Sequence, residues 1–306
     1  MEKLTEITII GFGNQAKAWA MNLRDSGINV YIGLRSNSQS VIHAQNLNFT
    51  TFSYESDTIP SKFFALLIPD ESHFEALDKM KVEHNKHVCI YAHGFSNIKF
   101  KLSQKFPYIK HLLLAPKSIA SEVRFLYETN KNISAIFSNE FCSDLTQNDI
   151  QEVASHIGFK NIYYSTFEQE THADLFSEQS ILCSLIPYGA LLAYNTLREN
   201  NYPKELAFFE CFYEIKLIAD TLLKVGPEKF FDLISPNALI GSQLGKDLLL
   251  DDNFQLKLNS ILKNIRKGDL VNQTDNIDIK TLRDQINNFW KNQEITSTYN
   301  ELREIL

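Results

Sequence analysis

The sequence predicts an α/β domain with a doubly wound, mainly parallel sheet, followed by an all-α domain. Short β-rich runs alternate with helical runs in the first half of the chain, which is typical of βαβ units. A turn with two glycines joins the first predicted strand to the first predicted helix. Beyond about residue 165 the strand signal fades and helical periodicity dominates. We therefore expect two domains, 1–165 and 166–306, which suits a length of 306 residues.

Each element follows from the period at which apolar residues recur. Strands are expected at Ile7–Phe12, Val30–Leu34, Phe63–Ile68, Val88–Tyr91, Leu112–Ala115, Ile133–Phe137 and Ile162–Tyr164. Helices are expected among them at Asn14–Asp25, Asp70–Val82 and Leu145–Ile157. The all-α half is expected to consist mainly of the helices Asp174–Arg198, Lys204–Val225, Asp252–Arg266 and Ile279–Trp290.

Composition excludes several classes of function. The net charge of −7, from 30 basic and 37 acidic residues, disfavours general nucleic-acid binding, which needs clustered Lys and Arg. The N-terminus lacks the apolar stretch of a signal peptide. The most apolar stretch, Ile181–Tyr194, is shorter than the ~18–20 residues of a membrane span. We therefore expect a buried helix there, no membrane partner and a cytoplasmic protein.

The cysteines carry no metal or redox signature. None forms a C-x-x-C pair, and all four lie in apolar or helical surroundings: Cys89, Cys142, Cys183 and Cys211. Buried thiols that form no disulfide, as in a reducing cytosol, are expected.

The glycine turn predicts a nucleotide site. Its residues are Gly11, Phe12, Gly13, Asn14, Gln15 and Ala16, which form a G-x-G-x-x-A fingerprint between strand and helix. The first glycine allows a tight turn, the second lets a pyrophosphate approach, and the small last residue lets the helix pack on the strand. The helix N-terminus offers N–H groups to phosphates. This context predicts a Rossmann-like domain, and the alternative is a plain strand–turn–helix corner.

The end of the second predicted strand favours NADPH over NADH. NAD enzymes usually carry an acidic residue there for the ribose hydroxyls. The segment Gly33–Ser40 has no acid but contains Arg35, Ser38 and Ser40, which could hold a 2′-phosphate. The alternative is a solvated loop in which Ser38 caps the next helix.

Two acidic pairs in the helical half suggest a metal site. Asp174 with Glu178, and Glu210 with Glu214, are each spaced i, i+4, which places a pair on one face of an α-helix. Both pairs lie in apolar sequence, where an unpartnered acid is costly to bury. Such oxygen ligands suit Mg²⁺. The alternative is salt-bridged or solvated helix faces.

Taken together, these segments resemble the ketol-acid reductoisomerase family. The resemblance runs in order over about residues 5–245 and includes GFGNQAKAWAMNLRDSG, GLRSNSQS, LLIPDE, AHGF and LLLAPK. It resumes with TFEQETHADLFSEQSILC, FFECFYEIKLI and IS. The DLFxEQ and FExxxE segments are much more specific than the glycine fingerprint.

The resemblance implies a site with two Mg²⁺ ions. Asp174 and Glu178 match the family's first two metal ligands, and Glu210 and Glu214 match the second acidic pair. In the family the two pairs come from different subunits, so the resemblance implies a homodimer with shared active sites, or a higher oligomer. It also implies the family's knotted helical domain.

The resemblance implies further site residues. Ser235 matches a serine that binds the substrate carboxylate, and Ala238 is assigned to the same substrate-binding segment. Lys117 matches a lysine beside the bridging carboxylate, and His93 matches a histidine near the nicotinamide. His93, Lys117 and Glu214 are therefore the expected catalytic residues, and His93 also belongs to the expected cofactor site. Arg35, Ser38 and Ser40 match the loop that selects NADP.

The reaction implied by the resemblance is alkyl migration followed by reduction of a 2-keto acid. Two Mg²⁺ ions polarise the ketone and hydroxyl of a 2-acetolactate-type substrate, and NADPH delivers a hydride to the rearranged keto acid. The products are the 2,3-dihydroxy acids of branched-chain amino acid biosynthesis.

The sequence departs from the family near the expected substrate. Ser118–Ser121 replaces Gly-Pro-Gly-His, Tyr213 stands where histidine is common, and Leu239 replaces an acid. The Asn- and Gln-rich end beyond about residue 270 resembles the family weakly. The alternatives are therefore a specialised reductase or reductoisomerase for another 2-keto acid, a non-catalytic NADP-binding protein, and a metal-independent β-hydroxyacid or imine reductase.

Overall fold

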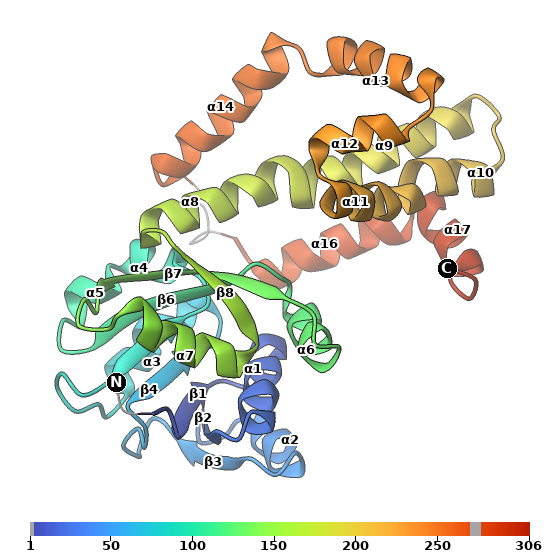
Figure 1. Cartoon of the computed structure of the whole chain (residues 1–306). Helices are drawn as coiled ribbons and strands as arrows, with labels where there is room; N and C mark the ends of the chain where they lie inside the picture. Colours follow the sequence, from blue (N-terminus) through green and yellow to red (C-terminus); the bar gives the residue numbers. More distant parts are fainter. Residues whose placement is uncertain (1–2, 270–276) are drawn as a thin grey trace. The chain divides into compact units, whose positions relative to one another are not determined.

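The computed structural model describes residues 3–269 and 277–306 and divides into two compact units (Figure 1). Unit 1 comprises Met1–Thr171 and unit 2 comprises His172–Leu306. Unit 1 is an α/β sheet domain and unit 2 is helical. The first part of the Asn- and Gln-rich end noted above, residues 270–276, lies outside the described residues.

Unit 1 is built on an eight-stranded sheet with the order β3-β2-β1-β4-β5-β6-β7-β8. The strands are β1 (Glu6–Ile10), β2 (Asn29–Leu34), β3 (Thr50–Ser53), β4 (Phe63–Leu66), β5 (Val88–Tyr91), β6 (Lys110–Pro116), β7 (Ile133–Phe141) and β8 (Phe159–Tyr164). All neighbours pair in parallel except β6 and β7, which are antiparallel. The predicted fold class, a Rossmann-like doubly wound sheet followed by a helical part, is confirmed.

The helices of unit 1 cover both faces of the sheet (Figure 1). They are α1 (Asn14–Asp25), α2 (Ser40–Asn46), the 3₁₀ turn η1 (Asp70–Ser72), α3 (His73–Lys79), α4 (Phe95–Phe100), α5 (Leu102–Lys105), α6 (Ala120–Glu128) and α7 (Gln147–Ile157). Helix α7 begins with a capping box between Thr146 and Asp149 and ends at Gly158, whose φ of 107° is left-handed. Such caps satisfy backbone groups that a helix end leaves unpaired.

Two apolar clusters form the core of unit 1, and each extends along one face of the sheet. One contains Trp19, which is fully buried. Its ring lies edge-on to the ring of Phe159, with the two centroids 5.5 Å apart. The other contains Tyr91, whose hydroxyl lies 2.8 Å from Nδ1 of the buried His111. Burial of this kind is the main source of stability in a folded domain.

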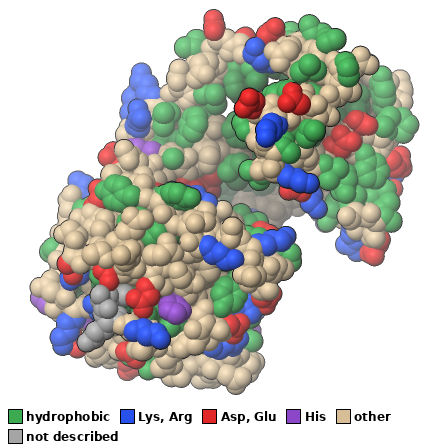
Figure 2. Space-filling view, viewed as in Figure 1, with side chains coloured by type: hydrophobic (Ala, Val, Ile, Leu, Met, Phe, Trp, Pro, Cys, Tyr) green, Lys and Arg blue, Asp and Glu red, His purple; other side chains and the backbone are tan. Residues whose placement is uncertain are grey.

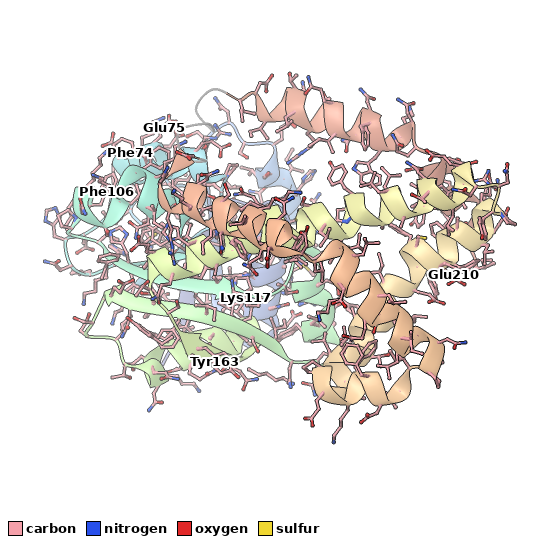
Figure 3. All side chains as sticks on the ribbon, turned by 90° about the horizontal axis from the view of Figure 1, so that it is seen from above. Phe74, Glu75, Phe106, Lys117, Tyr163 and Glu210 are labelled. Atoms are coloured by element: carbon pink, nitrogen blue, oxygen red, sulfur yellow. The ribbon has the colours of Figure 1, made fainter. Side chains whose placement is uncertain are left out.

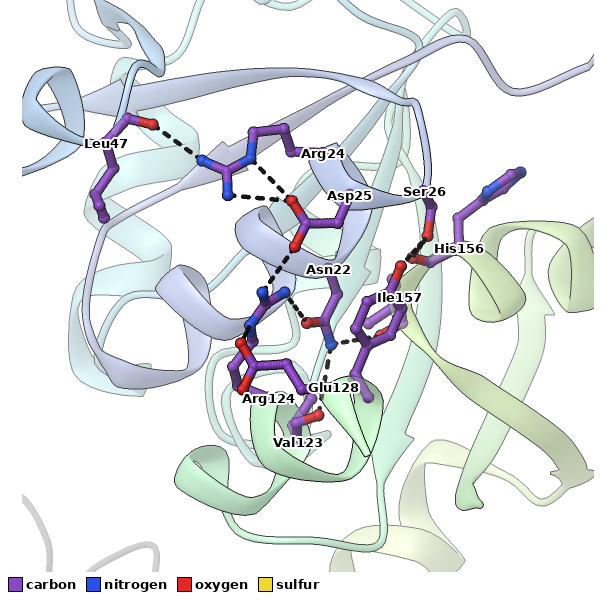
Figure 4. A network of polar contacts seen from close by, with 11 residues as sticks. Asn22, Arg24, Asp25, Ser26, Leu47, Val123, Arg124, Glu128, His156 and Ile157 are labelled. Atoms are coloured by element: carbon purple, nitrogen blue, oxygen red, sulfur yellow. Dashed lines mark hydrogen bonds and ion pairs between the residues drawn. The ribbon is translucent and has the colours of Figure 1, made fainter. Parts of the chain in front are cut away.

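A polar network ties α1 to α6 (Figure 4). Arg124 donates to Asn22 Oδ1 at 2.9 Å and pairs with Asp25 at 2.7 Å and Glu128 at 2.8 Å. Asn22 is fully buried and donates to the Ile157 carbonyl at 2.8 Å. The network therefore fixes α6 on the nucleotide-fingerprint helix.

Unit 2 begins with the last residues of α8 (Phe167–Ser177), a helix that crosses the division between the units. The helical elements that follow are η2 (Glu178–Leu185), α9 (Ile186–Glu199), α10 (Lys204–Phe208), η3 (Phe209–Tyr213), α11 (Glu214–Val225), α12 (Pro227–Leu233), α13 (Pro236–Leu249), α14 (Asp252–Arg266), α16 (Ile279–Lys291) and α17 (Glu294–Leu302). Elements η2 and η3 are π-helical, with i→i+5 hydrogen bonds. The sequence predicts continuous α-helices there, because π segments of eight and five residues are too short to show a period of their own.

The apolar side chains of unit 2 are only partly covered. Its cluster of buried residues has five members, Leu191, Tyr194, Ala207, Phe208 and Ile295. Figure 2 shows apolar side chains at the surface of these helices. Leu223 is 87% and Leu248 is 80% exposed. The prediction of a buried helix at Ile181–Tyr194 is therefore wrong for a single chain, because most of its apolar side chains are at least partly exposed.

The helical run Phe167–Glu199 meets the length and hydropathy of a membrane span, with 22% of its most apolar window buried. Soluble core helices meet the same criterion, so this is weak evidence for a membrane. The run carries Asp174 and Glu178, and charged side chains in membrane spans are rare.

Two further expectations differ from the structure. Cys89 and Cys142 are buried as expected, but Cys211 is half-buried and Cys183 is exposed. The sequence also gives no signal for strand β3 or for the short helices α4, α5 and α6. These elements have four to nine residues, which is too few for a clear period.

Candidate active site

A pocket of about 330 Å³ lies at the carboxyl ends of β1, β2 and β4 in unit 1. Successive strands are added on one side of β1 up to β3 and on its other side from β4 onward. Doubly wound sheets bind ligands at this switch in direction. All of the predicted cofactor residues except His93 line this pocket: Gly11, Phe12, Gly13, Asn14, Gln15, Arg35, Ser38 and Ser40.

The two fingerprint glycines have the geometry that a phosphate turn needs. Gly11 has a φ of 100°, and a Cβ there would lie 2.7 Å from the Leu67 carbonyl oxygen. Gly13 precedes α1, and a Cβ there would meet nothing within 4 Å. Gln15 lines the same pocket, and its buried Nε2 has no hydrogen-bond partner among the residues described. An unpaired donor at a helix N-terminus fits a phosphate-bearing cofactor.

The predicted 2′-phosphate loop borders the pocket. Arg35 is exposed, while Ser38 and Ser40 are half-buried. Ser38 Oγ accepts from the Ser40 N–H at 3.3 Å, so the serine stabilises the turn before α2 as well as facing the pocket. Tyr54, which the sequence did not suggest, also lines the pocket and is 6% exposed. Burial raises the pKa of Tyr54, so its hydroxyl stays neutral at pH 7.

His93 lies after β5, beside residues that follow β4. Strands β4 and β5 are parallel neighbours, so their carboxyl ends lie side by side. His93 Nδ1 is 3.8 Å from Asp70 Oδ2. Burial tends to raise the pKa of Asp70, but the nearby imidazoles of His93 and His73 outweigh it and hold that pKa below its usual value.

Lys117 follows β6 (Figure 3). It pairs with Glu170, a residue that the sequence analysis did not identify. Its Nζ lies 2.7 Å from Glu170 Oε1, and the Glu170 side chain is 1% exposed. Glu170 Oε2 is buried and has no hydrogen-bond partner within the described part of the chain. The signal for Glu170 was its spacing, since it lies four residues before Asp174 on the same helix.

Glycine is required at position 94 by close packing. A Cβ on Gly94 would lie 2.3 Å from Thr171 Oγ1 and 3.1 Å from the Phe167 carbonyl oxygen. The turn that carries His93 is therefore pressed against the first turns of α8, the helix that continues to Asp174.

The acidic pairs lie where α-helix meets π-helix. Asp174 is half-buried on α8, and Glu178 is the first residue of η2. Glu210 lies within η3 (Figure 3), and Glu214 follows it. A π turn adds a residue to the helix, so Glu210 and Glu214 are not spaced as on the uniform α-helix that was predicted. Single π turns inside α-helices are frequent at functional sites.

Each acidic pair also has a cysteine beside it. Burial, then the charges of Glu178 and Asp174, raise the pKa of the Cys183 thiol. Burial, then the charge of Glu210, raise the pKa of Cys211. Both thiols therefore stay protonated at neutral pH and are not reactive thiolates.

The four predicted metal ligands do not form one cluster in a single chain. Within residues 3–269 and 277–306, no group of three or more His, Cys, Asp or Glu side chains is placed to hold a metal ion. The carboxylate donor set itself suits Mg²⁺, which prefers oxygen ligands and keeps several waters.

The predicted substrate residues lie at the start of α13. Ser235 is the N-cap, and its Oγ accepts from the Ala238 N–H at 3.2 Å. The hydroxyl proton of Ser235 remains available to donate to a carboxylate, and the helix N-terminus favours an anion.

The sheet fold and its switch-point pocket define a dinucleotide-dependent oxidoreductase with a second, helical unit. Family models match nearly the whole chain: the acetohydroxy acid isomeroreductase NADPH-binding domain matches residues 2–161, and the ketol-acid reductoisomerase C-terminal domain matches residues 167–306. The chain belongs to the ketol-acid reductoisomerase family, as the sequence motifs indicated. It is therefore an NADP-dependent oxidoreductase and isomerase by family.

Individual relatives agree with this assignment. A ketol-acid reductoisomerase (NADP(+)) of Tropheryma whipplei (strain TW08/27) is 33% identical over 279 residues, covering 87% of this chain and 81% of that protein. The solved structure of an NADH-preferring ketol-acid reductoisomerase from an uncultured archean is 25% identical, with a TM-score of 0.89 and coverage of 99% of this chain and 95% of that one. A pyrroline-5-carboxylate reductase from Streptococcus pyogenes, at 17% identity and a TM-score of 0.56, covers 85% of this chain and 97% of that one and shares the fold alone.

Proposed function

We propose that this chain is an NADPH- and Mg²⁺-dependent ketol-acid reductoisomerase that acts on 2-acetolactate-type substrates, working as a cytoplasmic homodimer with shared active sites. The observation that carries the proposal is the presence of two acidic pairs, each beside a π turn, in the unit that matches the family's C-terminal domain. A plain hydroxyacid or imine reductase needs neither pair.

The residues divide the work as follows. Asp174, Glu178, Glu210 and Glu214 would hold Mg²⁺, while the pocket at Gly11–Gln15 would bind the cofactor phosphates. When bound, Mg²⁺ polarises substrate oxygens and NADPH supplies a hydride. Ser235 would donate a hydrogen bond to the substrate carboxylate, and Glu214 would exchange protons with substrate oxygens.

A homodimer accounts for two features of unit 2. Its apolar side chains are too exposed for a stable monomer surface, since Leu244 and Leu249 are each 68% exposed. The two acidic pairs do not meet in one described chain. A second copy would cover the apolar surface and bring a complementary pair.

The test is NADPH oxidation at 340 nm with Mg²⁺, comparing 2-acetolactate with 3-hydroxy-3-methyl-2-ketobutyrate. We expect turnover of both substrates, lost when Mg²⁺ is chelated and lost in Glu178→Gln and Glu210→Gln. Near-normal turnover in either variant would refute a role of these acids in metal binding. If NADPH binds but neither substrate causes its oxidation, a non-catalytic protein would be favoured.

The cofactor preference has its own test. Arg35→Asp removes the cation that we assign to the 2′-phosphate and adds a repulsive charge, so the ratio of kcat/KM for NADPH to that for NADH should fall by about 100-fold or more. An unchanged ratio would exclude Arg35 as the determinant. The comparison matters because one similar solved structure is described as NADH-preferring.

A second candidate, a specialised enzyme for another 2-keto acid, is favoured by the loop after Lys117. Ile119, which stands where the family usually has proline, is 71% exposed and places a large apolar side chain in this loop. Turnover of the keto acid without turnover of 2-acetolactate would support this candidate.

A further inference from the structure

Two histidines and an acid meet at the ends of β4 and β5 in unit 1. Asp70 begins η1 and His73 begins α3, both after β4, while His93 and Ser96 follow β5. Asp70 Oδ1 is 3.6 Å from His73 Nδ1, and Asp70 Oδ2 is 3.8 Å from His93 Nδ1. The Asp70 carboxylate therefore lies between two imidazoles. The protonation of each ring decides which of them can donate a hydrogen bond to it.

The tautomer of His73 is fixed by its other partners. Its Nε2 lies 2.9 Å from the Ile68 carbonyl oxygen, which can only accept, so Nε2 carries the proton. Its Nδ1 lies 2.6 Å from Ser96 Oγ and accepts the serine proton. Burial lowers the pKa of His73 in spite of the nearby Asp70, so the ring is neutral at pH 7. Its Nδ1 therefore has no proton to offer Asp70.

His93 is the imidazole that can donate to Asp70. The side chain of Asp70 is 32% exposed and that of His93 is 26% exposed, so water screens their interaction only in part. Burial would raise the pKa of Asp70, yet this pKa stays below its usual value. His93 contributes most among the groups that lower it. Asp70 is thus an ionised acceptor that faces Nδ1 of His93.

We propose that Asp70 is a positioning residue for His93: its carboxylate holds the proton on Nδ1 and thereby fixes the ring with Nε2 turned toward the cofactor and substrate. The proposal rests on the proposed function only in placing His93 beside the nicotinamide. Orienting acids of this kind set the tautomer of a working histidine without being protonated themselves. The separation is 3.8 Å, and contacts of this kind often tighten when substrate or cofactor binds.

The test reads the tautomer directly by ¹⁵N NMR of the imidazole rings in the full chain, with the His93 signals assigned from a His93→Gln spectrum. In the wild type we expect the neutral ring of His93 to carry its proton on Nδ1. In Asp70→Ala the acceptor is gone, so the Nε2–H form should become the major one. Glu71→Ala, which removes the exposed acid next in sequence, is the matched control and should leave His93 unchanged.

Two further readouts separate positioning from damage to the fold. The tautomer of His73 should stay as in the wild type, since it is set by Ile68 and Ser96. In Asp70→Asn, which keeps the shape but loses the charge, His93 should titrate at a lower pH than in the wild type. With active enzyme, kcat should fall by about 100-fold in Asp70→Ala while KM for NADPH changes little.

The outcomes are distinct. An unchanged His93 tautomer in Asp70→Ala, with His73 undisturbed, overturns the proposal whatever the activity. If Asp70→Ala does not fold, an unchanged His93 titration in Asp70→Asn overturns it. If the wild type has no reductoisomerase activity, the proposed function fails, while the tautomer still decides whether Asp70 orients His93.

Discussion

The two units of this chain bury their apolar side chains to very different degrees. Unit 1 has two clusters of nearly inaccessible residues, with Trp19, Tyr91 and Phe159 fully buried. Among its described residues, unit 2 has one cluster of five buried residues, while Leu223 remains 87% exposed. Unit 1 therefore has a complete core within one chain. We infer that unit 2 carries the apolar sequence of a core whose other half belongs to a second copy.

The largest expected effect tests that inference in α13. Leu244 and Leu248 are 68% and 80% exposed, and in the proposed dimer they are covered. Leu244→Glu combined with Leu248→Glu should weaken dimerisation by at least about 6 kcal/mol, because four leucine side chains per dimer lose their burial. Sedimentation equilibrium at micromolar concentration is the measurement. It should give the mass of a dimer for the wild type and the mass of a monomer for the double variant.

A matched control lies in unit 1. Ile42 and Phe125 are 64% and 49% exposed on α2 and α6. Ile42→Glu combined with Phe125→Glu should leave the mass unchanged. Equal dissociation in both double variants would show that exposure in unit 2 does not mark an interface.

The next effect concerns the completed core of unit 1. Trp19→Ala should lower stability by about 4 kcal/mol, because it removes a large buried ring and leaves a cavity. The free energy of unfolding, measured by denaturant unfolding and by hydrogen exchange of the amides in β1 and β8, gives the loss. The loss should be the same at low and high protein concentration, since no second copy covers this residue. A loss that depends on concentration would contradict a self-contained unit 1.

A pH effect of about 3 kcal/mol is expected from one buried histidine in unit 1. Burial lowers the pKa of His111 from 6.5 to about 4. Below pH 6.5 the unfolded chain binds a proton that the folded chain rejects, so stability is complete above pH 6.5 and falls as the pH drops toward 4. His111→Gln, which can keep both hydrogen bonds, should flatten the stability profile between these values. His43→Gln at an exposed site is the control and should not flatten it.

The smallest effect compares one helix cap from each unit. Thr146 caps α7 in unit 1 and Ser235 caps α13 in unit 2. Thr146→Ala and Ser235→Ala should each cost about 1 kcal/mol of stability, measured by urea unfolding. Only Ser235→Ala should also raise KM for the substrate, because only that hydroxyl is assigned to a carboxylate. Equal KM values in both variants would remove Ser235 from the substrate site.

The nucleotide half of the site was predictable because its signals are local. The turn at Gly11–Gln15 and the loop at Arg35–Ser40 are each read from adjacent residues, and the structure brings both to one pocket. The antiparallel pairing of β7 with β6 was not predictable, since strand direction depends on the connection and not on strand composition.

The residues that sequence reasoning missed depend on contacts between distant segments. Asp70 reaches His93 across two strand ends, and Glu170 reaches Lys117 across 53 positions of sequence. No periodicity reports such pairs. The π turns were missed for a different reason, since a single extra residue in a helix hardly changes its apolar pattern.

The π segments also act as a phase shift between the two ends of a helix. In an α-helix each residue advances the side-chain direction by about 100°. If the same residues of Glu178–Leu185 formed i→i+4 hydrogen bonds instead, the helix would be more regular. Asp174 and Glu178 would then be rotated by roughly one such step relative to α9 and the cluster around Tyr194. A regular α-helix of the same length would therefore point these carboxylates in a different direction.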